Sequence, residues 1–158
     1  MSTWPLKAGA LRFGRTFLLE KDKKPIARAF TEWCLLNADT NEVLRSSVLT
    51  MPIDEYLTDK GIEGKFSGAK ADAPALVYSH TVRASDLDIN RHVNNITYIK
   101  FALDCFDTKE LESIDIKSFE MYYVSQCFEG QTLELYRQDN LIEAVCDGRT
   151  VFRCTINL

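Results

Sequence analysis

Residues 93–106, VNNITYIKFALDCF, decide the fold of this 158-residue chain, because they carry its one long helical pattern. Apolar side chains recur there at steps of three and four, at Val93, Ile96, Ile99, Ala102 or Leu103, and Phe106. This spacing gives a helix one apolar stripe that another element must cover. We therefore expect a helix from about Val93 to Phe106 that packs against a sheet.

Strand patterns lie on both sides of this helix. One precedes it at residues 76–83, and four follow it at residues 116–125, 132–137, 142–146 and 150–157. Short polar connections separate the last four, and Asp147-Gly148 is a strong hairpin signal. These elements predict an α+β fold in which an antiparallel sheet wraps around one long helix, the arrangement called the hot-dog fold.

The chain before residue 76 has a different character. Two strands are expected at residues 11–20 and 26–37, and residues 43–51 form either a further strand or an extended exit. Residues 59–75 contain three glycines, three lysines and few large apolar groups, which is typical of a linker. We therefore place a domain boundary in this segment.

Composition and charge exclude several classes of protein. Hydrophobic residues make up 46% and charged residues 27%, as in a soluble globular protein, and the roughly 20 apolar residues needed to span a membrane do not occur in one run. The net charge is −4, and the basic residues are scattered, which argues against a nucleic-acid surface. The N-terminus resembles neither a secretion signal nor a transit peptide, so we expect a cytoplasmic protein.

The five cysteines include no Cys-x-x-Cys pair. Their odd number and spacing suggest neither a disulfide framework nor a zinc site, so most are expected to be small buried side chains in a reducing compartment. We expect no metal and no cofactor.

The loop before the helix is the densest collection of polar groups in the chain. Asp88, Asn90 and His92 alternate there, so a tight loop can bring a carboxylate, an amide and an imidazole together. Free amide groups at the following helix N-terminus can stabilise an oxyanion. Hydrolysis of an ester or thioester is possible, with Asp88 accepting a proton from water while Asn90 and His92 orient water or substrate.

From spacing alone, a structural role such as capping is the more frequent explanation of these residues. Asp and Asn before a helix are common caps, and Asn is frequent in turns. A single histidine near a helix start, such as His92, is more often a packed or capping residue than a catalyst. The other histidine, His80, lies in the middle of an expected strand and is most simply structural.

A longer match favours the chemical interpretation. The segment from Asp88 to Tyr98, DINRHVNNITY, closely resembles the Asp-x-Asn-x-His-Val-Asn-Asn-x-x-Tyr signature of acyl-acyl-carrier-protein (acyl-ACP) thioesterases, where it introduces the helix of the second hot-dog repeat. Residues 3–5, 13–17 and 27–33 look like the end of that family's first repeat. The resemblance implies a partial N-terminal hot-dog repeat of strands only at residues 1–58, a linker at 59–75 and a complete C-terminal repeat at 76–158.

The resemblance also implies roles for individual residues. Asp88, Asn90 and His92 take the positions of the family's catalytic network, and Gln126-Cys127 takes the place of its Glu and a following Cys or other small residue. The remaining signature residues, Asn94, Asn95 and Tyr98, would bind substrate. The implied partners are acyl carrier protein and a fatty acyl chain. Hot-dog domains commonly pair their sheets, so a homo-oligomer is expected.

Three alternatives remain open at this point. Gln126 cannot act as a base, so the protein could be a catalytically weak acyl-binding or oligomer-forming protein. It could also act on acyl-CoA instead of acyl-ACP. Cys127, activated by His92, could be the nucleophile in place of water, although hot-dog thioesterases in general work without a covalent nucleophile.

Overall fold

The structure is a computed structural model that describes residues 1–50, 52, 55–63, 66 and 68–158. The chain divides into two compact units, Met1–Lys65 (unit 1) and Phe66–Leu158 (unit 2). The division falls inside the segment expected to be a linker, of which residues 64, 65 and 67 lie outside the described residues. The finer boundaries of the two repeats remain a prediction.

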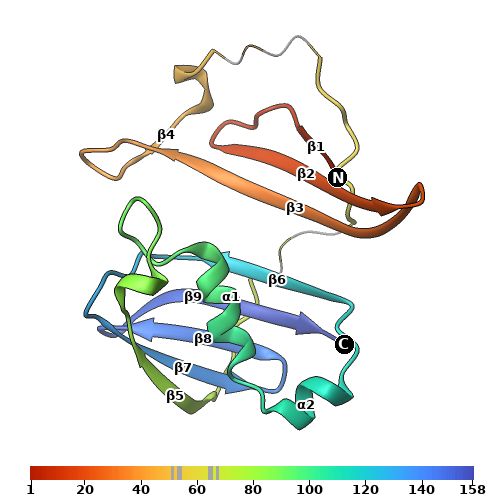
Figure 1. The fold of residues 1–158 in the computed structure, drawn as a ribbon. Helices are drawn as coiled ribbons and strands as arrows, with labels where there is room; N and C mark the ends of the chain where they lie inside the picture. The colour runs from red at the N-terminus through yellow and green to blue at the C-terminus, as the bar shows by residue number, and fades with distance from the viewer. Residues whose placement is uncertain (51, 53–54, 64–65, 67) are drawn as a thin grey trace. The chain divides into compact units, whose positions relative to one another are not determined.

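Unit 2 is built on one five-stranded antiparallel sheet with a helix across one face (Figure 1). Its strands are β5 (Ala75–Thr81), β6 (Ser118–Tyr123), β7 (Thr132–Gln138), β8 (Leu141–Cys146) and β9 (Arg149–Asn157). Their spatial order is β5-β7-β8-β9-β6, so β7, β8 and β9 form a meander between two edge strands. All five strands were expected, and their bounds differ by at most two residues at each end.

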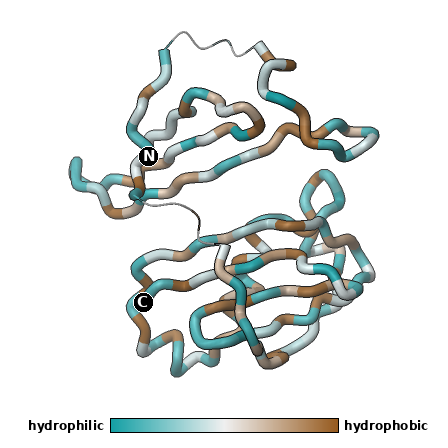
Figure 2. The backbone as a smooth tube through the Cα atoms, turned by 180° about the vertical axis from the view of Figure 1, so that it is seen from behind, coloured by the Kyte–Doolittle hydropathy of each residue, from teal (hydrophilic) through white to brown (hydrophobic). Residues whose placement is uncertain are grey.

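The central strands alternate between buried and more accessible positions, and Figure 2, seen from behind, colours the same strands by hydropathy. Leu133 and Leu135 on β7, Ile142 on β8 and Phe152 on β9 are at most 1% exposed. Because side chains alternate between the faces of a strand, this pattern turns one face of the sheet into a core that the helix must cover.

The covering helix is α1 (Asn95–Leu103), which is shorter than expected. Its buried residues are Tyr98, Phe101 and Ala102, whereas Ile96 is 63% exposed. Val93, Ala102 and Phe106 of the predicted stripe are buried, but Ile96 was wrong. The helix turns the aromatic rings of Tyr98 and Phe101 to the sheet instead, because they bury more apolar area than an isoleucine.

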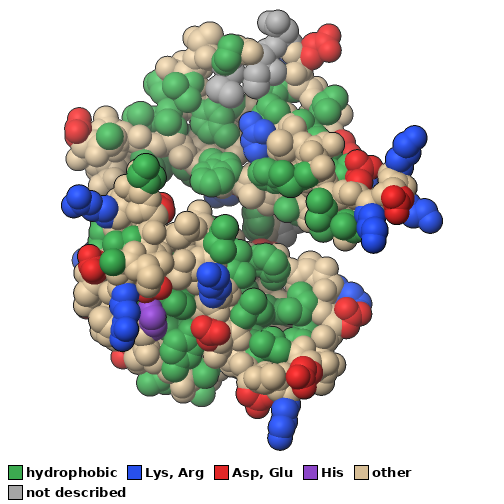
Figure 3. Space-filling model, in the orientation of Figure 1, with side chains coloured by type: hydrophobic (Ala, Val, Ile, Leu, Met, Phe, Trp, Pro, Cys, Tyr) green, Lys and Arg blue, Asp and Glu red, His purple; other side chains and the backbone are tan. Residues whose placement is uncertain are grey.

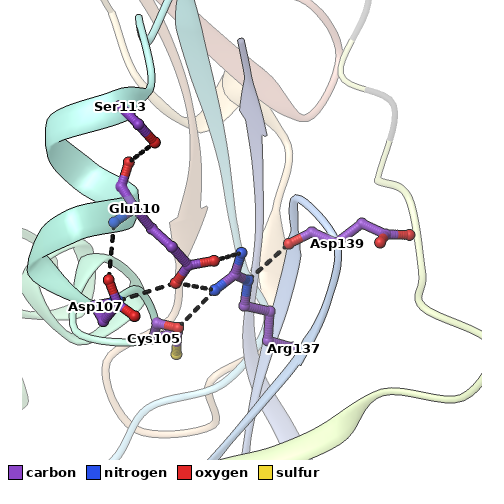
Figure 4. A network of polar contacts seen from close by, with 6 residues as sticks. All are labelled: Cys105, Asp107, Glu110, Ser113, Arg137 and Asp139. Atoms are coloured by element: carbon purple, nitrogen blue, oxygen red, sulfur yellow. Dashed lines mark hydrogen bonds and ion pairs between the residues drawn. The ribbon is translucent and has the colours of Figure 1, made fainter.

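A second helix, α2 (Thr108–Ser113), follows α1 and was not predicted. It starts with a capping box, in which Asp107 accepts a hydrogen bond from the Glu110 N–H and Glu110 caps Asp107 in return. Arg137 on β7 ties this helix to the sheet through both oxygens of Glu110 (Figure 4). The same guanidinium lies 3.7 Å from the Phe106 ring centroid and donates to the Cys105 carbonyl.

Unit 1 is a four-stranded antiparallel sheet in the order β1-β2-β3-β4. Its strands are β1 (Ser2–Pro5), β2 (Arg12–Lys21), β3 (Lys24–Leu36) and β4 (Val43–Leu44). The β2–β3 hairpin was expected, and Asp22 and Lys23 at its tip have the positive φ angles of a tight hairpin turn. The strand expected as one possibility at residues 43–51 ends at Leu44, because a 3-10 turn (Ser46–Val48) follows. Residue 51 lies outside the described residues.

Burial differs sharply between the two units. Among the described residues of unit 1 only Thr16 is fully buried, whereas unit 2 holds the whole apolar cluster of buried side chains. Large apolar side chains such as Ile26 and Trp33 are more than half exposed, and hydrophobic side chains are visible on the face drawn in Figure 3. Among the described residues, the helices are too short and too polar to cross a membrane.

Candidate active site

The loop between β5 and α1 closes on itself through backbone hydrogen bonds. The Asp88 N–H donates to the His92 carbonyl at 2.8 Å, and the Arg91 N–H donates to the Asp88 carbonyl at 3.0 Å. Arg91 has a φ of 62°, in the left-handed region that a tight reversal requires. Leu87 and Val93 form a bridge at the base of the loop, so residues 88–92 form a compact polar tip.

The Asp88 side chain points back into this tip. Its Oδ1 accepts hydrogen bonds from the backbone N–H of Asn90 at 2.8 Å and of His92 at 3.3 Å. Asp88 is half-buried, and within the described residues no other donor bonds its carboxylate. The arrangement fixes the orientation of the carboxylate and leaves Oδ2 available for a water molecule.

A second segment, residues 126–128, lies beside the loop. The Val93 N–H donates to the Cys127 carbonyl at 3.0 Å, and the His92 ring meets the Phe128 ring edge-on, with centroids 5.1 Å apart. The fold therefore brings residues 88–93 and 126–128 together, although they are more than 30 positions apart. The side chains of Asn90 and Gln126 are exposed, and neither makes a hydrogen bond to the described residues.

The start of α1 completes the site. Asn94 is the N-cap, and its Oδ1 accepts from the Ile96 N–H at 2.9 Å. The first N–H of the helix, on the exposed Asn95, has no acceptor within the helix. This N–H can therefore donate to a developing oxyanion, and the partial positive charge of the helix N-terminus favours negative charge there.

Cys127 occupies an environment unlike that of a reactive thiol. Its side chain is 0% exposed, and burial raises the pKa of the thiol above its ordinary value despite a neighbouring hydrogen bond from Cys146. A nucleophilic cysteine requires a lowered pKa and access to substrate. The surroundings of Cys127 favour water as the nucleophile over the alternative in which the thiol attacks.

Tyr98, expected to contact substrate, lies in the core of unit 2. It is 3% exposed, and its ring packs against those of Phe101, Tyr123 and Phe152. Burial raises the pKa of its hydroxyl, and within the described residues this hydroxyl has no hydrogen-bond partner. Tyr98 thus contributes to the packing beneath the site, and a contact with substrate stays a prediction.

One polar contact at the site was missed at the sequence level. His80 on β5 lies 2.8 Å, from Nε2 to Oδ2, from Asp86 at the entrance to the loop. Burial favours a raised pKa for Asp86, but the hydrogen bonds from His80 and the Arg83 N–H outweigh it, so the pKa lies below its usual value. A spacing of six residues carries no helical or strand signal, which is why the pair could not be found from periodicity.

An antiparallel sheet folded around one principal helix defines unit 2 as a hot-dog unit. Residues 69–155 match the family model of the acyl-ACP thioesterase C-terminal domain. The chain belongs to the acyl-ACP thioesterase family.

Named relatives support this assignment. The chain is 24% identical over 165 residues to oleoyl-acyl carrier protein thioesterase 2, chloroplastic, of Arabidopsis thaliana. It is 27% identical over 147 residues to palmitoyl-acyl carrier protein thioesterase, chloroplastic, of Cuphea hookeriana. These alignments cover 95% and 85% of this chain but only 42% and 34% of the relatives. The chain thus spans about two fifths or less of their length.

Solved structures give the same picture. An acyl-ACP thioesterase from Bacteroides thetaiotaomicron superimposes with a TM-score of 0.74 at 28% identity, covering 98% of this chain and 65% of that one. A 12:0-ACP thioesterase from Umbellularia californica gives a TM-score of 0.70 at 23% identity, with the same coverage. The second likeness shows the hot-dog fold alone, which agrees with the expected α+β architecture.

Proposed function

We propose that this protein is a thioester hydrolase that releases a fatty acid from acyl-ACP. The observation that carries the proposal is the loop at residues 88–92. The Asp88 carboxylate is oriented there next to His92, and the loop leads into the N-terminus of α1. Membership of the acyl-ACP thioesterase family supports acyl carrier protein as the partner and a fatty acyl chain as the substrate group.

In the proposed reaction, Asp88 accepts a proton from water, and the hydroxyl oxygen attacks the thioester carbonyl carbon. The Asn95 N–H stabilises the oxyanion, while Asn90 and His92 orient the water and the carbonyl. Collapse of the tetrahedral intermediate breaks the carbon–sulfur bond. The carrier thiolate then leaves and takes up the proton held by Asp88, which balances the reaction.

The same proposal covers the setting of the protein. We place it in fatty acid biosynthesis. We also propose a homo-oligomer, because β6 is an edge strand whose outer side could pair with another sheet. Its location is proposed to be a reducing, soluble compartment. The cytoplasm is our expectation from the sequence, although the named plant relatives are chloroplastic.

A substrate panel tests the proposal. The purified chain is given acyl-ACP and acyl-CoA of matched chain lengths, and free fatty acid is measured. Faster release from acyl-ACP supports the proposal. Release from acyl-CoA alone would identify an acyl-CoA thioesterase, and release from neither would contradict hydrolysis by this chain.

Gln126 favours a second candidate function, a hot-dog protein that binds acyl groups but hydrolyses them weakly. Its side chain stands where the family pattern has a Glu, and a neutral amide cannot accept a proton from water.

The substitution Gln126→Glu separates the two functions. If a second carboxylate is what the site lacks, turnover of acyl-ACP should rise by about 10²-fold or more. The control is Asn140→Asp, the same kind of amide-to-carboxylate change in the turn between β7 and β8. Gln131→Glu would be a poor control, because the Gln131 side chain donates a hydrogen bond to Asp147. An unchanged rate in Gln126→Glu would show that position 126 does not limit catalysis.

A further inference from the structure

We propose that His80 and Asp86 are positioning residues that hold the loop at residues 86–94 between β5 and α1, and so set the place of Asp88 and of the first amide of the helix. The inference rests on the proposed function for its catalytic consequence. Its structural part, the fixing of the loop, can be tested without any turnover.

Asp86 is the point at which three parts of the site meet. Its Oδ2 accepts from His80 Nε2 and from the Arg83 N–H, both at 2.8 Å. Its backbone carbonyl accepts from the N–H of Asn94, the N-cap of α1, at 2.9 Å. One residue therefore joins β5, the loop and the helix start, two positions before Asp88.

His80 is held from the other side by α1. Its ring lies 4.4 Å, centroid to centroid, from that of Phe101, and Tyr78, on the same face of β5, donates to the Phe101 carbonyl at 2.9 Å. The imidazole is only 28% exposed and the Asp86 side chain 14%, so water competes weakly for their hydrogen bond. Because an ionised carboxylate only accepts, Nε2 of His80 must carry the proton.

These contacts give the carboxylates of Asp86 and Asp88 different roles. Asp86 accepts two hydrogen bonds at Oδ2, from His80 and from the Arg83 N–H, and its pKa is lowered, which makes it a poor base. Asp88 faces the tip of the loop. A shift of the Asp86 anchor would move Asp88 and the Asn95 N–H together, and misplacement of about 1 Å can cost up to 10²-fold in rate.

Two substitutions at position 80 separate the hydrogen bond from packing. His80→Phe keeps an aromatic ring against Phe101 but removes the donor. His80→Gln keeps an N–H donor near the position of Nε2 but removes the ring. Ser79→Ala is the matched control, because Ser79 is exposed and belongs to the opposite face of the same strand.

The first measurement is hydrogen exchange of backbone amides in the three variants. In His80→Phe, the N–H groups of Asp88, Arg91 and Asn94 should exchange about tenfold faster or more, while those of β8 and β9 stay unchanged. His80→Gln and Ser79→Ala should stay close to the wild type. Equal exchange in His80→Phe and the wild type would overturn the proposal, whether or not the protein hydrolyses acyl-ACP.

The second measurement is steady-state turnover of acyl-ACP. His80→Phe should lower kcat by about 10- to 100-fold with KM nearly unchanged, and His80→Gln should recover most of the loss. Faster exchange with unchanged kcat would overturn the catalytic part of the inference. If the wild type hydrolyses nothing, the proposed function fails, and the exchange result alone decides whether His80 and Asp86 fix the loop.

Discussion

Two aspartates two positions apart, Asp86 and Asp88, show how local contacts separate residues of the same type. Asp86 is bonded by the His80 side chain and by a backbone N–H, whereas Asp88 is bonded, among the described residues, only by the backbone of its own loop. Their sequence context is nearly the same. The contacts of the folded chain, and not the sequence, distinguish the two carboxylates.

At Cys127 we predict that Cys127→Ala keeps most of the turnover of acyl-ACP. The thiol is fully buried and its pKa is raised, so little thiolate exists to attack a thioester. Rapid-quench mass spectrometry of the wild type should detect no acyl adduct on this residue. Cys154→Ala, another buried cysteine of unit 2, controls for the loss of packing. Loss of turnover in Cys127→Ala but not in Cys154→Ala, together with an acyl adduct in the wild type, would identify Cys127 as the nucleophile.

Sequence alone could predict the residues of the loop but not all of their partners. Asp88, Asn90 and His92 share one short segment, so their proximity follows from spacing. The approach of Cys127 to Val93 depends on how the segment after β6 packs, and that of His80 to Asp86 on the face that β5 turns to α1. Neither contact has a local sequence signal.

At the scale of elements, strands were predicted better than helices. Alternation and hairpin turns located β5 to β9, because each strand repeats a two-residue pattern against a neighbour. Helix α1 was predicted to be too long, because the apolar residues continue its helical spacing as far as Phe106. The capping box of Asp107 and Glu110 was the overlooked signal that one helix ends and α2 begins.

For the contact between α2 and β7 we predict that Arg137→Lys destabilises unit 2 at neutral pH. Lysine cannot reproduce the two-pronged bond to Glu110, and the loss of hydrogen bonds to the Cys105 and Asp139 carbonyls should cost about 1–2 kcal/mol. Urea denaturation measures the change. Arg149→Lys, at an exposed position of β9, is the control.

The same pair predicts a dependence on pH. Hydrogen bonds from Arg137 and from the Asp107 N–H lower the pKa of Glu110. A lowered carboxyl pKa adds stability above the ordinary value, about 4.3, and this stability is lost as the pH falls through the lower folded-state pKa. The stability difference between wild type and Arg137→Lys should therefore shrink in acid. A difference that is the same at neutral and acid pH would contradict an ion-pair contribution.

At the scale of the molecule, the two units differ in the contacts that stabilise each of them internally. Unit 2 has a continuous buried cluster, whereas unit 1 has backbone pairing with large apolar groups left accessible. The sequence predicts a boundary at residues 59–75, which stays a prediction. It could not predict this contrast, because β2 and β3 are as apolar as the strands of unit 2, and burial depends on what packs against them.

We therefore predict that unit 1 opens before unit 2. Amides of β2 and β3 should exchange with solvent at lower denaturant concentrations than those of β7, β8 and β9, since few buried contacts resist their opening. Hydrogen exchange with mass spectrometry measures both units in one sample, so each is a control for the other. Simultaneous opening of both would show that they form a single cooperative unit.

The central claim is that Asp88 accepts the proton from water during thioester hydrolysis. Its most direct test is kcat for release of fatty acid from acyl-ACP by the wild type, Asp88→Asn and Asp72→Asn, the last being the same change at an exposed site. We predict that Asp88→Asn lowers kcat by about 10²- to 10⁴-fold and that Asp72→Asn leaves it unchanged. Equal kcat in Asp88→Asn and the wild type would contradict the claim.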